Sequence, residues 1–346
     1  MSPYPVPEQL KVLQHQRVMT QLYHPFTFSE KVTIPGNLFL APMAGYTDAA
    51  WRGFAVKWGA DLCYTEMVSC EALSRDSSKT MDMMRKAEEE QIYAIQIFTS
   101  SPETAVKALP YVLAQKPSVI DINCGCPVPK VLKGGCGAAL GRNPELMHKI
   151  IKALTENTDV PITVKIRSGW DKNSINFLEA ADAAQDAGAA AVTLHPRTRS
   201  QDYAGKADWP LIKKLKDHIS IPVIASGDIF SPEAARDVLE TTGCDGVMVA
   251  RGAVGCPEIF KYAKELLTTG SYTKIPQGQK LENAMEHFAR SVKYIGEDRA
   301  CKEMKKHLCC YTKGLPGSAE IRNKIVFCTS ADEYLGTLRK FLEENN

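Results

Sequence analysis

Short apolar runs recur along this chain, and each is followed by a turn rich in Gly or polar residues and then by an amphipathic helical pattern. The runs are LFLAPM (38–43), LCYTEM (62–67), YAIQIF (93–98), VIDIN (119–123), ITVKI (162–166), AVTLH (191–195), PVIAS (222–226) and GVMVA (246–250). Continuous apolar strands are typical of a parallel sheet buried on both faces. Eight strand–helix repeats over roughly 230 residues predict an α/β fold, a (β/α)8 TIM barrel.

The alternative parallel fold is a doubly wound open sheet. That fold favours a GxGxxG turn after its first strand, whereas AGYTD follows LFLAPM here. We therefore expect an N-terminal extension (1–34), a catalytic barrel (35–270) and a small C-terminal helical domain (276–346), which shows helical periodicity and no strand pattern.

Composition excludes several classes of protein. No stretch approaches 18 consecutive apolar residues, and residues 1–30 lack the apolar core of a signal peptide. The eleven cysteines contain no CxxC pair, which argues against a disulfide framework and against a zinc site. We expect a cytoplasmic, monomeric protein that has no membrane segment and holds no metal.

Polar residues stand where the predicted strands end. In a barrel these ends meet at one face, which is where barrel enzymes place their catalytic groups. The residues are Gln96, Asn123, Lys165, Arg167, His195, Ser226-Gly227-Asp228 and Arg251-Gly252. Their number predicts a functional site at that face.

Lys165 is unusual because it lies inside an apolar strand, and buried lysines are almost always paired. It is either half of a buried ion pair or a cation placed beside an anionic ring or phosphate. Gly227 and Arg251-Gly252 follow the seventh and eighth strands, where barrels bind phosphate with backbone N–H groups. Ordinary turn glycines and a surface arginine are the alternative interpretation.

Cys126 and His195 are candidates for chemistry. Cys126 lies in the loop NCGCP after the fourth strand, although a lone cysteine is more often an inert small hydrophobe. His195 alone would fit a core histidine, but its place at a strand end favours function.

The C-terminal region carries a concentration of positive charge. Residues 290–324 contain nine basic and four acidic residues. If 299–313 form one helix, Arg299, Lys302, Lys306 and Lys313 share one face, opposite an apolar stripe. We expect this face to contact RNA phosphates, although a solvated helix face would show the same pattern. The apolar stripe consists of Ala300, Cys301, Met304, Leu308 and Tyr311.

Several segments together resemble the tRNA-dihydrouridine synthase family. They are APMAGYTDAAWR (41–52), DINCGCPVPKVLKGGCGAAL (121–140), VKIRSGW (164–170), LHPRTRSQDYAGKADW (194–209), IPVIASGDI (221–229) and VARGAVGCPEIF (249–260), and KKHLCCYTKG (305–314) is similar to its helical domain. The resemblance implies an FMN enzyme, reduced by NADPH, that saturates the C5–C6 bond of a uridine in tRNA.

The resemblance also implies roles for individual residues. Cys126 would be the catalytic acid. Cofactor contacts would come from Pro42, Met43, Ala44, Gln96, Lys165, His195, Ser226, Gly227, Asp228, Ala250 and Arg251. Substrate contacts would come from Asn123, Arg167, Arg197, Lys302, Lys306 and Lys313. The family often has Asn-Gly-Asp at 226–228, His-Gly-Arg at 195–197 and Gly-Arg at 250–251, so Ser226 and Ala250 offer mainly backbone donors.

Two other functions remain open at this point. An FMN barrel that reduces a free pyrimidine, similar to dihydroorotate dehydrogenase, would share the barrel face but would not need a basic helical tail. A non-catalytic RNA-binding barrel would need the tail but not the flavin.

Overall fold

Parallel strands form the centre of the fold in the computed structural model, which describes residues 22–345. The strands are β3 (Leu38–Leu40), β4 (Leu62–Cys63), β5 (Val68–Ser69), β6 (Ala94–Phe98), β7 (Val119–Cys124), β8 (Ile162–Gly169), β9 (Ala191–Thr198), β10 (Val223–Ser226) and β11 (Gly246–Val249). Their order is β4-β3-β11-β10-β9-β8-β7-β6-β5, and a parallel bridge between Tyr64 and Ala94 joins the ends. The ring confirms the predicted barrel.

The second barrel strand differs from the prediction of one strand over 62–67, which is wrong. Regular strand pairing stops after β4 and resumes at β5. Between them the Tyr64–Ala94 bridge and a hydrogen bond from Thr65 N to Ala94 O at 2.9 Å keep part of the backbone pairing. Side chains add to it: Thr65 Oγ1 accepts a hydrogen bond from Gln96 N at 3.1 Å, and the Glu66 carboxylate accepts one from Gly45 N.

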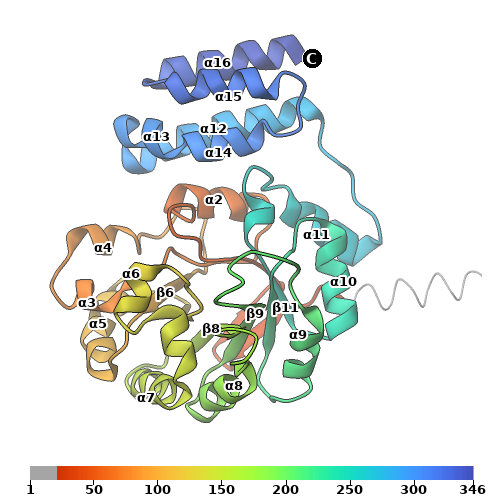
Figure 1. The fold of residues 1–346 in the computed structure, drawn as a ribbon. Helices are drawn as coiled ribbons and strands as arrows, with labels where there is room; N and C mark the ends of the chain where they lie inside the picture. Colours follow the sequence, from red (N-terminus) through yellow and green to blue (C-terminus); the bar gives the residue numbers. More distant parts are fainter. Residues whose placement is uncertain (1–21, 346) are drawn as a thin grey trace, which may run out of the picture.

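Helices cover the outside of the ring (Figure 1). They are α2 (Ala49–Lys57), α3 (Cys70–Leu73), α4 (Ser78–Asp82), α5 (Pro102–Ala114), α6 (Pro129–Lys133), η1 (Gly137–Arg142), α7 (Pro144–Thr155), α8 (Phe177–Asp186), α9 (Trp209–Lys216), α10 (Pro232–Thr242), η2 (Arg251–Ala253) and α11 (Ile259–Thr269). Ser101, Asn143 and Ser231 cap three of them through their side chains, and each is followed by Pro at the first helical position.

A hairpin closes the amino ends of the strands, and no sequence signal identified it. Its strands β1 (Phe26–Ser29) and β2 (Val32–Ile34) are antiparallel. Phe26 packs edge-on against Phe39 of β3, with ring centroids 5.2 Å apart. The same apolar cluster includes Val119, Ala191 and Ile224 near the starts of three strands. The amino end is therefore filled with apolar side chains.

The C-terminal helices form a separate layer beside α2 (Figure 1). They are α12 (Gln277–Ile295), α13 (Glu297–Glu303), α14 (Lys305–Tyr311), α15 (Ser318–Phe327) and α16 (Ala331–Asn345). Trp51 of α2 packs against His287 of α12 and His307 of α14, with centroids 4.8 and 5.7 Å apart. None of the helices within residues 22–345 is long and apolar enough to cross a bilayer.

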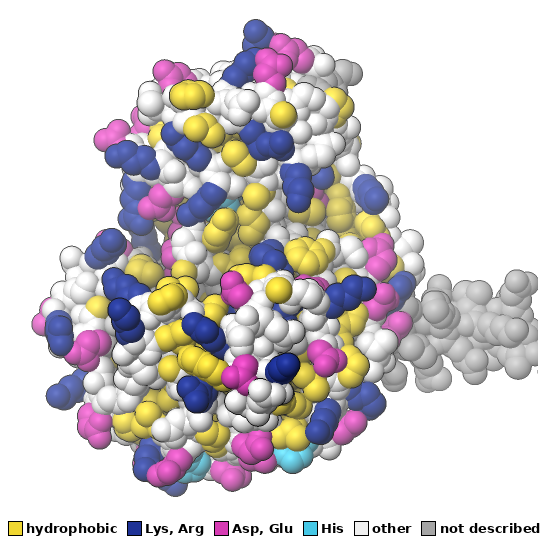
Figure 2. Space-filling view, viewed as in Figure 1, with side chains coloured by type: hydrophobic (Ala, Val, Ile, Leu, Met, Phe, Trp, Pro, Cys, Tyr) yellow, Lys and Arg dark blue, Asp and Glu magenta, His cyan; other side chains and the backbone are white. Residues whose placement is uncertain are grey.

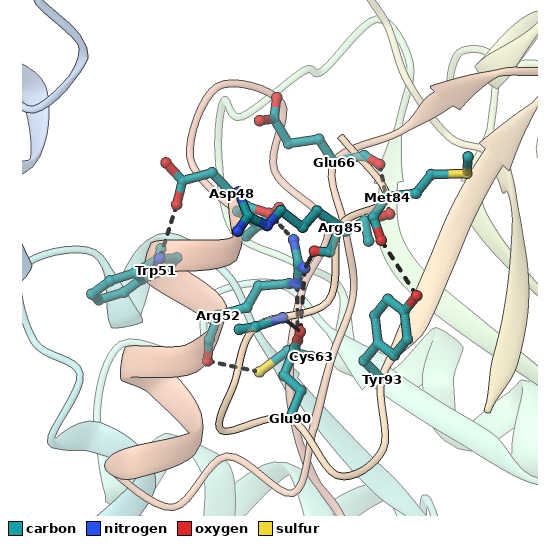
Figure 3. A network of polar contacts seen from close by, with 12 residues as sticks. Asp48, Trp51, Arg52, Cys63, Glu66, Met84, Arg85, Glu90 and Tyr93 are labelled. Atoms are coloured by element: carbon teal, nitrogen blue, oxygen red, sulfur yellow. Dashed lines mark hydrogen bonds and ion pairs between the residues drawn. The ribbon is translucent and has the colours of Figure 1, made fainter. Parts of the chain in front are cut away.

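Three consecutive glutamates connect the barrel to this layer. Glu88 pairs with Lys293 of α12 at 2.7 Å, and Glu89 pairs with Arg290 of the same helix. Glu90 turns inward and pairs with Arg52 of α2 at 2.8 Å, with both side chains fully buried (Figure 3). One short segment is thus held from both sides.

We predict that Glu90→Gln destabilises the protein far more than Glu88→Gln. Removing one partner of a buried ion pair leaves an uncompensated charge and costs about 3–5 kcal/mol. The Glu88–Lys293 pair is largely exposed, and such pairs contribute about 0–1 kcal/mol. Denaturant unfolding of both variants measures the difference; equal losses of stability would contradict this account of the Arg52–Glu90 pair.

Candidate functional site

Strand register places polar side chains in rows across the interior of the barrel. Gln96 pairs with Asp121, which pairs with Thr163, and two residues further on Asn123 pairs with Lys165. Since alternate residues of a strand share a face, these side chains point the same way. The residues between them belong to the core beneath the helices: Ile120, Ile122, Val164 and Ile166.

Asp121 is the centre of the first row. Its carboxylate accepts hydrogen bonds from Gln96 Nε2 and Thr163 Oγ1, both at 2.7 Å. Gln96 Oε1 in turn accepts one from Asn123 Nδ2 at 2.8 Å. Burial raises the pKa of Asp121 to about 6. Asp121 is a site residue that the sequence prediction missed, although an acidic residue inside an apolar strand is a signal that could have identified it.

The loop that carries Cys126 is built on Asn123. Asn123 Oδ1 accepts hydrogen bonds from the backbone N–H groups of Gly125 and Cys126, at 3.2 and 2.9 Å. Gly137 packs beneath with φ of 61°, and a Cβ there would stand 2.7 Å from the Cys126 carbonyl oxygen. Burial raises the pKa of the Cys126 thiol, while Arg167 and Lys165 oppose that shift. The thiol therefore stays protonated at neutral pH.

Lys165 is an unpaired cation inside the barrel. Its ammonium makes no hydrogen bond or ion pair with any residue in the range 22–345, so the structure offers no support for the buried ion pair that the sequence left open. Burial lowers its pKa to about 8, and Arg167 adds to that shift. Lys165 itself is partly buried, and its ammonium has no acceptor among residues 22–345. A cation in this setting fits a site for an anionic or carbonyl-bearing ligand.

Arg167 and His195 face each other in the register of β8 and β9. Arg167 Nε donates to Gly125 O at 2.8 Å, so the arginine also fixes the Cys126 loop. Burial and the surrounding cations lower the pKa of His195 to about 2, which keeps its ring neutral. The exposed ring of Tyr203 lies over Arg167, 5.8 Å from its guanidinium carbon. Tyr203 is a second residue that the sequence analysis did not assign.

Arg197 is held in the wall of the site. Its guanidinium forms a bidentate pair with Asp228, at 2.9 and 2.7 Å, and also donates to the carbonyl oxygens of Ala204 and Gly205. Only 1% of Arg197 is exposed. A contact between Arg197 and substrate stays a prediction.

Two glycines allow close backbone approach where β10 and β11 end. Gly227 has φ of 112°, and a Cβ there would lie 2.8 Å from His195 Cδ2. A Cβ on Gly252 would lie 2.1 Å from the carbonyl oxygen of Ile229. Neighbouring protein atoms therefore exclude side chains at both positions, and the phosphate interpretation stays a prediction.

Arg251 lies beside these glycines with 44% of its side chain exposed. Its Nη2 is 3.5 Å from Asp228 Oδ1, and its guanidinium carbon is 4.4 Å from the Tyr203 ring centroid. The Arg251 guanidinium therefore has N–H donors available to a ligand at the carboxyl end of the barrel. Ser226 is buried before Gly227, and Ala250 is partly exposed before Arg251.

The loop after β3 contributes Pro42, Met43 and Ala44. Met43 N donates to Thr47 Oγ1 at 3.0 Å, which fixes the turn before α2. Pro42 and Met43 are partly exposed and Ala44 is exposed, so this turn borders the same barrel face.

The helical region corrects one prediction, since residues 299–313 do not form a single helix. α13 ends at Glu303 and α14 begins at Lys305, because the chain turns at Met304. Arg299 pairs with Glu303 at 2.7 Å and is not a free cation. The expected apolar stripe is nonetheless buried: Ala300, Cys301, Met304, Leu308 and Tyr311.

The three lysines of this region differ in their surroundings. Lys302 and Lys313 are exposed. Lys306 lies over the ring of Tyr46, 4.9 Å from its centroid, and so reaches the loop after β3. Figure 2 shows Lys and Arg side chains on the helical region above the barrel and near the junction between the helical region and the barrel. Within residues 22–345, no three His, Cys, Asp or Glu side chains gather as metal ligands.

Comparisons with known proteins agree with one another. Residues 39–346 match the family model described as Dihydrouridine synthase (Dus). The chain is 43% identical over 328 residues to a probable tRNA-dihydrouridine synthase of Treponema pallidum (strain Nichols), covering 92% of this chain and 96% of that protein. It is 39% identical over 279 residues to tRNA-dihydrouridine synthase B of Shewanella oneidensis, covering 80% and 87%.

Solved structures share the fold at low sequence identity. An old yellow enzyme homologue from Zymomonas mobilis superposes with a TM-score of 0.55 at 13% identity, covering 75% of this chain and 98% of that one. Histamine dehydrogenase from Rhizobium sp. 4-9 gives a TM-score of 0.53 at 14% identity, covering 78% and 51%. These likenesses support the barrel.

We predict that Arg251→Ala weakens FMN binding by tenfold or more, whereas Lys214→Ala, on the outer surface of α9, leaves it unchanged. A charge-assisted contact to phosphate contributes roughly 1.5–3 kcal/mol. Titration of the flavin-free proteins with FMN measures both. Parental affinity in the Arg251 variant would exclude a contact between Arg251 and the phosphate.

Proposed function

The chain belongs to the dihydrouridine synthase family, and we propose that its barrel performs the family's reaction with bound FMN and with NADPH as electron donor. The reaction is the reduction of the C5–C6 double bond of uridine in tRNA to dihydrouridine. The protein is therefore an oxidoreductase that acts on tRNA.

The observation that carries the cofactor proposal is the unpaired ammonium of Lys165. It stands inside the barrel, between the Cys126 loop and the glycine-lined ends of β10 and β11. FMN, when bound, supplies the hydride and carries negative charge once it is reduced. Lys165 would hold the ring, and the backbone at Gly227 and Gly252 together with Arg251 would hold the phosphate. Gln96, Pro42, Met43, Ala44 and the neutral His195 would complete the cofactor contacts.

Asn123 and Arg167 would orient the uracil. Each already fixes the Cys126 loop through a hydrogen bond, and Arg167 Nη2 donates to no residue in the range 22–345. Binding the base would therefore place it beside the Cys126 thiol. Arg197 would support this wall through its pair with Asp228.

Cys126 would donate the proton that C5 needs when C6 is reduced. A proton donor must keep its proton until the reaction, and burial raises the pKa of this thiol above its ordinary value. The proton would pass from Sγ to C5, and the resulting thiolate would lie near the positive charges of Arg167 and Lys165.

A substrate as large as tRNA would need the surface that the helical region adds to the barrel. A uridine in folded RNA must leave its stack to enter a barrel, which costs a few kcal/mol and needs an extended docking surface. Lys302, Lys306 and Lys313 would contact tRNA phosphates. Reduction of a free pyrimidine is set aside, because the relatives act on tRNA by name and match most of this chain, its helical region included.

We predict that Cys126→Ala keeps its flavin and the reduction of that flavin by NADPH, but forms dihydrouridine about 10²–10⁴-fold more slowly. Single-turnover reaction of the pre-reduced enzyme with unmodified tRNA measures the step. Cys124→Ala is the control, because Cys124 belongs to the apolar core and should have a mild effect. A normal single-turnover rate in the Cys126 variant would refute the proton-donor role.

The pKa of Lys165 gives a second prediction, for the reduction of flavin by NADPH. Since its pKa is lowered to about 8, the ammonium is charged at pH 7 and loses its proton as the pH rises through 8. The loss removes charge that stabilises the reduced ring. The flavin reduction rate should fall above pH 8 in the parent. In Lys165→Met it should be about tenfold lower at pH 7 and should lack this fall. Identical pH profiles would exclude Lys165 as the group responsible.

A further inference from the structure

Two arginines lie over one indole ring at the rim of the barrel. The guanidinium carbons of Arg142 and Arg199 are 4.5 and 4.8 Å from the centroid of the Trp170 ring. Arg142 ends η1, Trp170 directly follows β8, and Arg199 directly follows β9. Three segments at the carboxyl ends of the strands therefore meet in this cluster, which the reaction described above does not use.

Backbone hydrogen bonds hold the three segments together. Arg199 N donates to Gly169 O at 2.9 Å, and both the backbone N and the hydroxyl of Ser200 donate to Trp170 O, at 2.9 and 2.7 Å. Asn176 Nδ2 donates to Gly141 O at 2.9 Å, which ties η1 to the loop after β8. The cluster is thus fixed before any ligand arrives.

The donors of both arginines lack protein partners. Within residues 22–345, neither guanidinium makes a hydrogen bond or an ion pair, and Arg199 Nε is buried without an acceptor. Stacking on an aromatic ring occupies the face of a guanidinium and leaves its in-plane N–H groups free. One stacked arginine would be enough to stabilise a loop. Here two arginines lie over the same ring, so two positive charges are close together, and no carboxylate is bonded to either.

We propose that Arg142, Trp170 and Arg199 bind a phosphodiester of the tRNA backbone next to the extruded uridine, an inference that rests on the proposed function. In-plane guanidinium donors match the oxygens of a phosphate, and a phosphate would relieve the repulsion between the two cations. The cluster adjoins the reaction site, because Arg167 Nη1 donates to the carbonyl oxygen of Thr198, the residue before Arg199, at 3.0 Å.

The position of the cluster complements that of the helical region. In the ring order, β8 lies across the barrel from β3, whose loop contacts Lys306 through Tyr46. α7 and α8, which flank the cluster in sequence, lie on the far side of the barrel from α12–α16 (Figure 1). The RNA would be held on opposite sides of the mouth, with the uridine between them.

The test compares Arg142→Ala/Arg199→Ala with Lys107→Ala/Lys214→Ala, which removes the same charge from the outer surfaces of α5 and α9. Binding of unmodified tRNA is measured at about 50 and 200 mM salt, a range over which each phosphate contact changes the affinity markedly. The arginine variant should bind roughly tenfold or more weakly at low salt, with a shallower salt dependence. The lysine variant should bind like the parent. Flavin content and NADPH oxidation without tRNA should be unchanged in both.

A third variant, Trp170→Leu, keeps both charges but removes the ring, and it should weaken binding less than the double arginine variant. Parental affinity and salt dependence in the arginine variant would overturn the proposal, as would equal losses in the lysine variant. If the parent binds tRNA through these arginines but forms no dihydrouridine, the proposed function fails and the phosphate site stands.

Discussion

The site depends on one buried carboxylate, that of Asp121. A charge inside a barrel is costly unless hydrogen bonds satisfy it, and here Gln96 and Thr163 from the two neighbouring strands do so. Because Gln96 is fixed by Asp121, it can orient Asn123, whose other amide atom holds the Cys126 loop. The position of the proposed acid is therefore set by a chain of hydrogen bonds that starts in the barrel interior.

The positive charge at the carboxyl end of the barrel follows from the parallel arrangement of the strands. Parallel strands end at one edge, so Lys165, Arg167 and Arg251 gather there, while burial keeps His195 neutral. Asp228 pairs closely with Arg197 in the wall, whereas the ion pairs of Arg167 with Asp202 and of Arg251 with Asp228 are longer, at 3.8 and 3.5 Å, and Lys165 has none. An excess of positive charge within low-dielectric walls is suited to a ligand with an anionic ring and a phosphate, and to an RNA substrate.

The barrel and the polar strand ends could be predicted from sequence because both follow from local patterns: apolar runs, the amphipathic stretches after them, and polar residues where the runs end. The hairpin β1–β2 could not be predicted from sequence, because its short strands are recognisable only through their packing on Phe39. The break of the second strand depends on bonds from Thr65 and Glu66 to distant segments. The turn at Met304 and the pairing of Arg197 with Asp228 likewise depend on tertiary contacts that no periodicity reveals.

The most direct test of the central claim is nucleoside mass spectrometry of unmodified tRNA after incubation with the purified protein, FMN and NADPH. The account predicts a uridine-derived nucleoside heavier by two hydrogens, which forms only when protein and NADPH are both present and is largely lost with Cys126→Ala. A parent protein that binds FMN and oxidises NADPH but leaves every uridine unreduced in tRNA, while reducing a free pyrimidine, would contradict it.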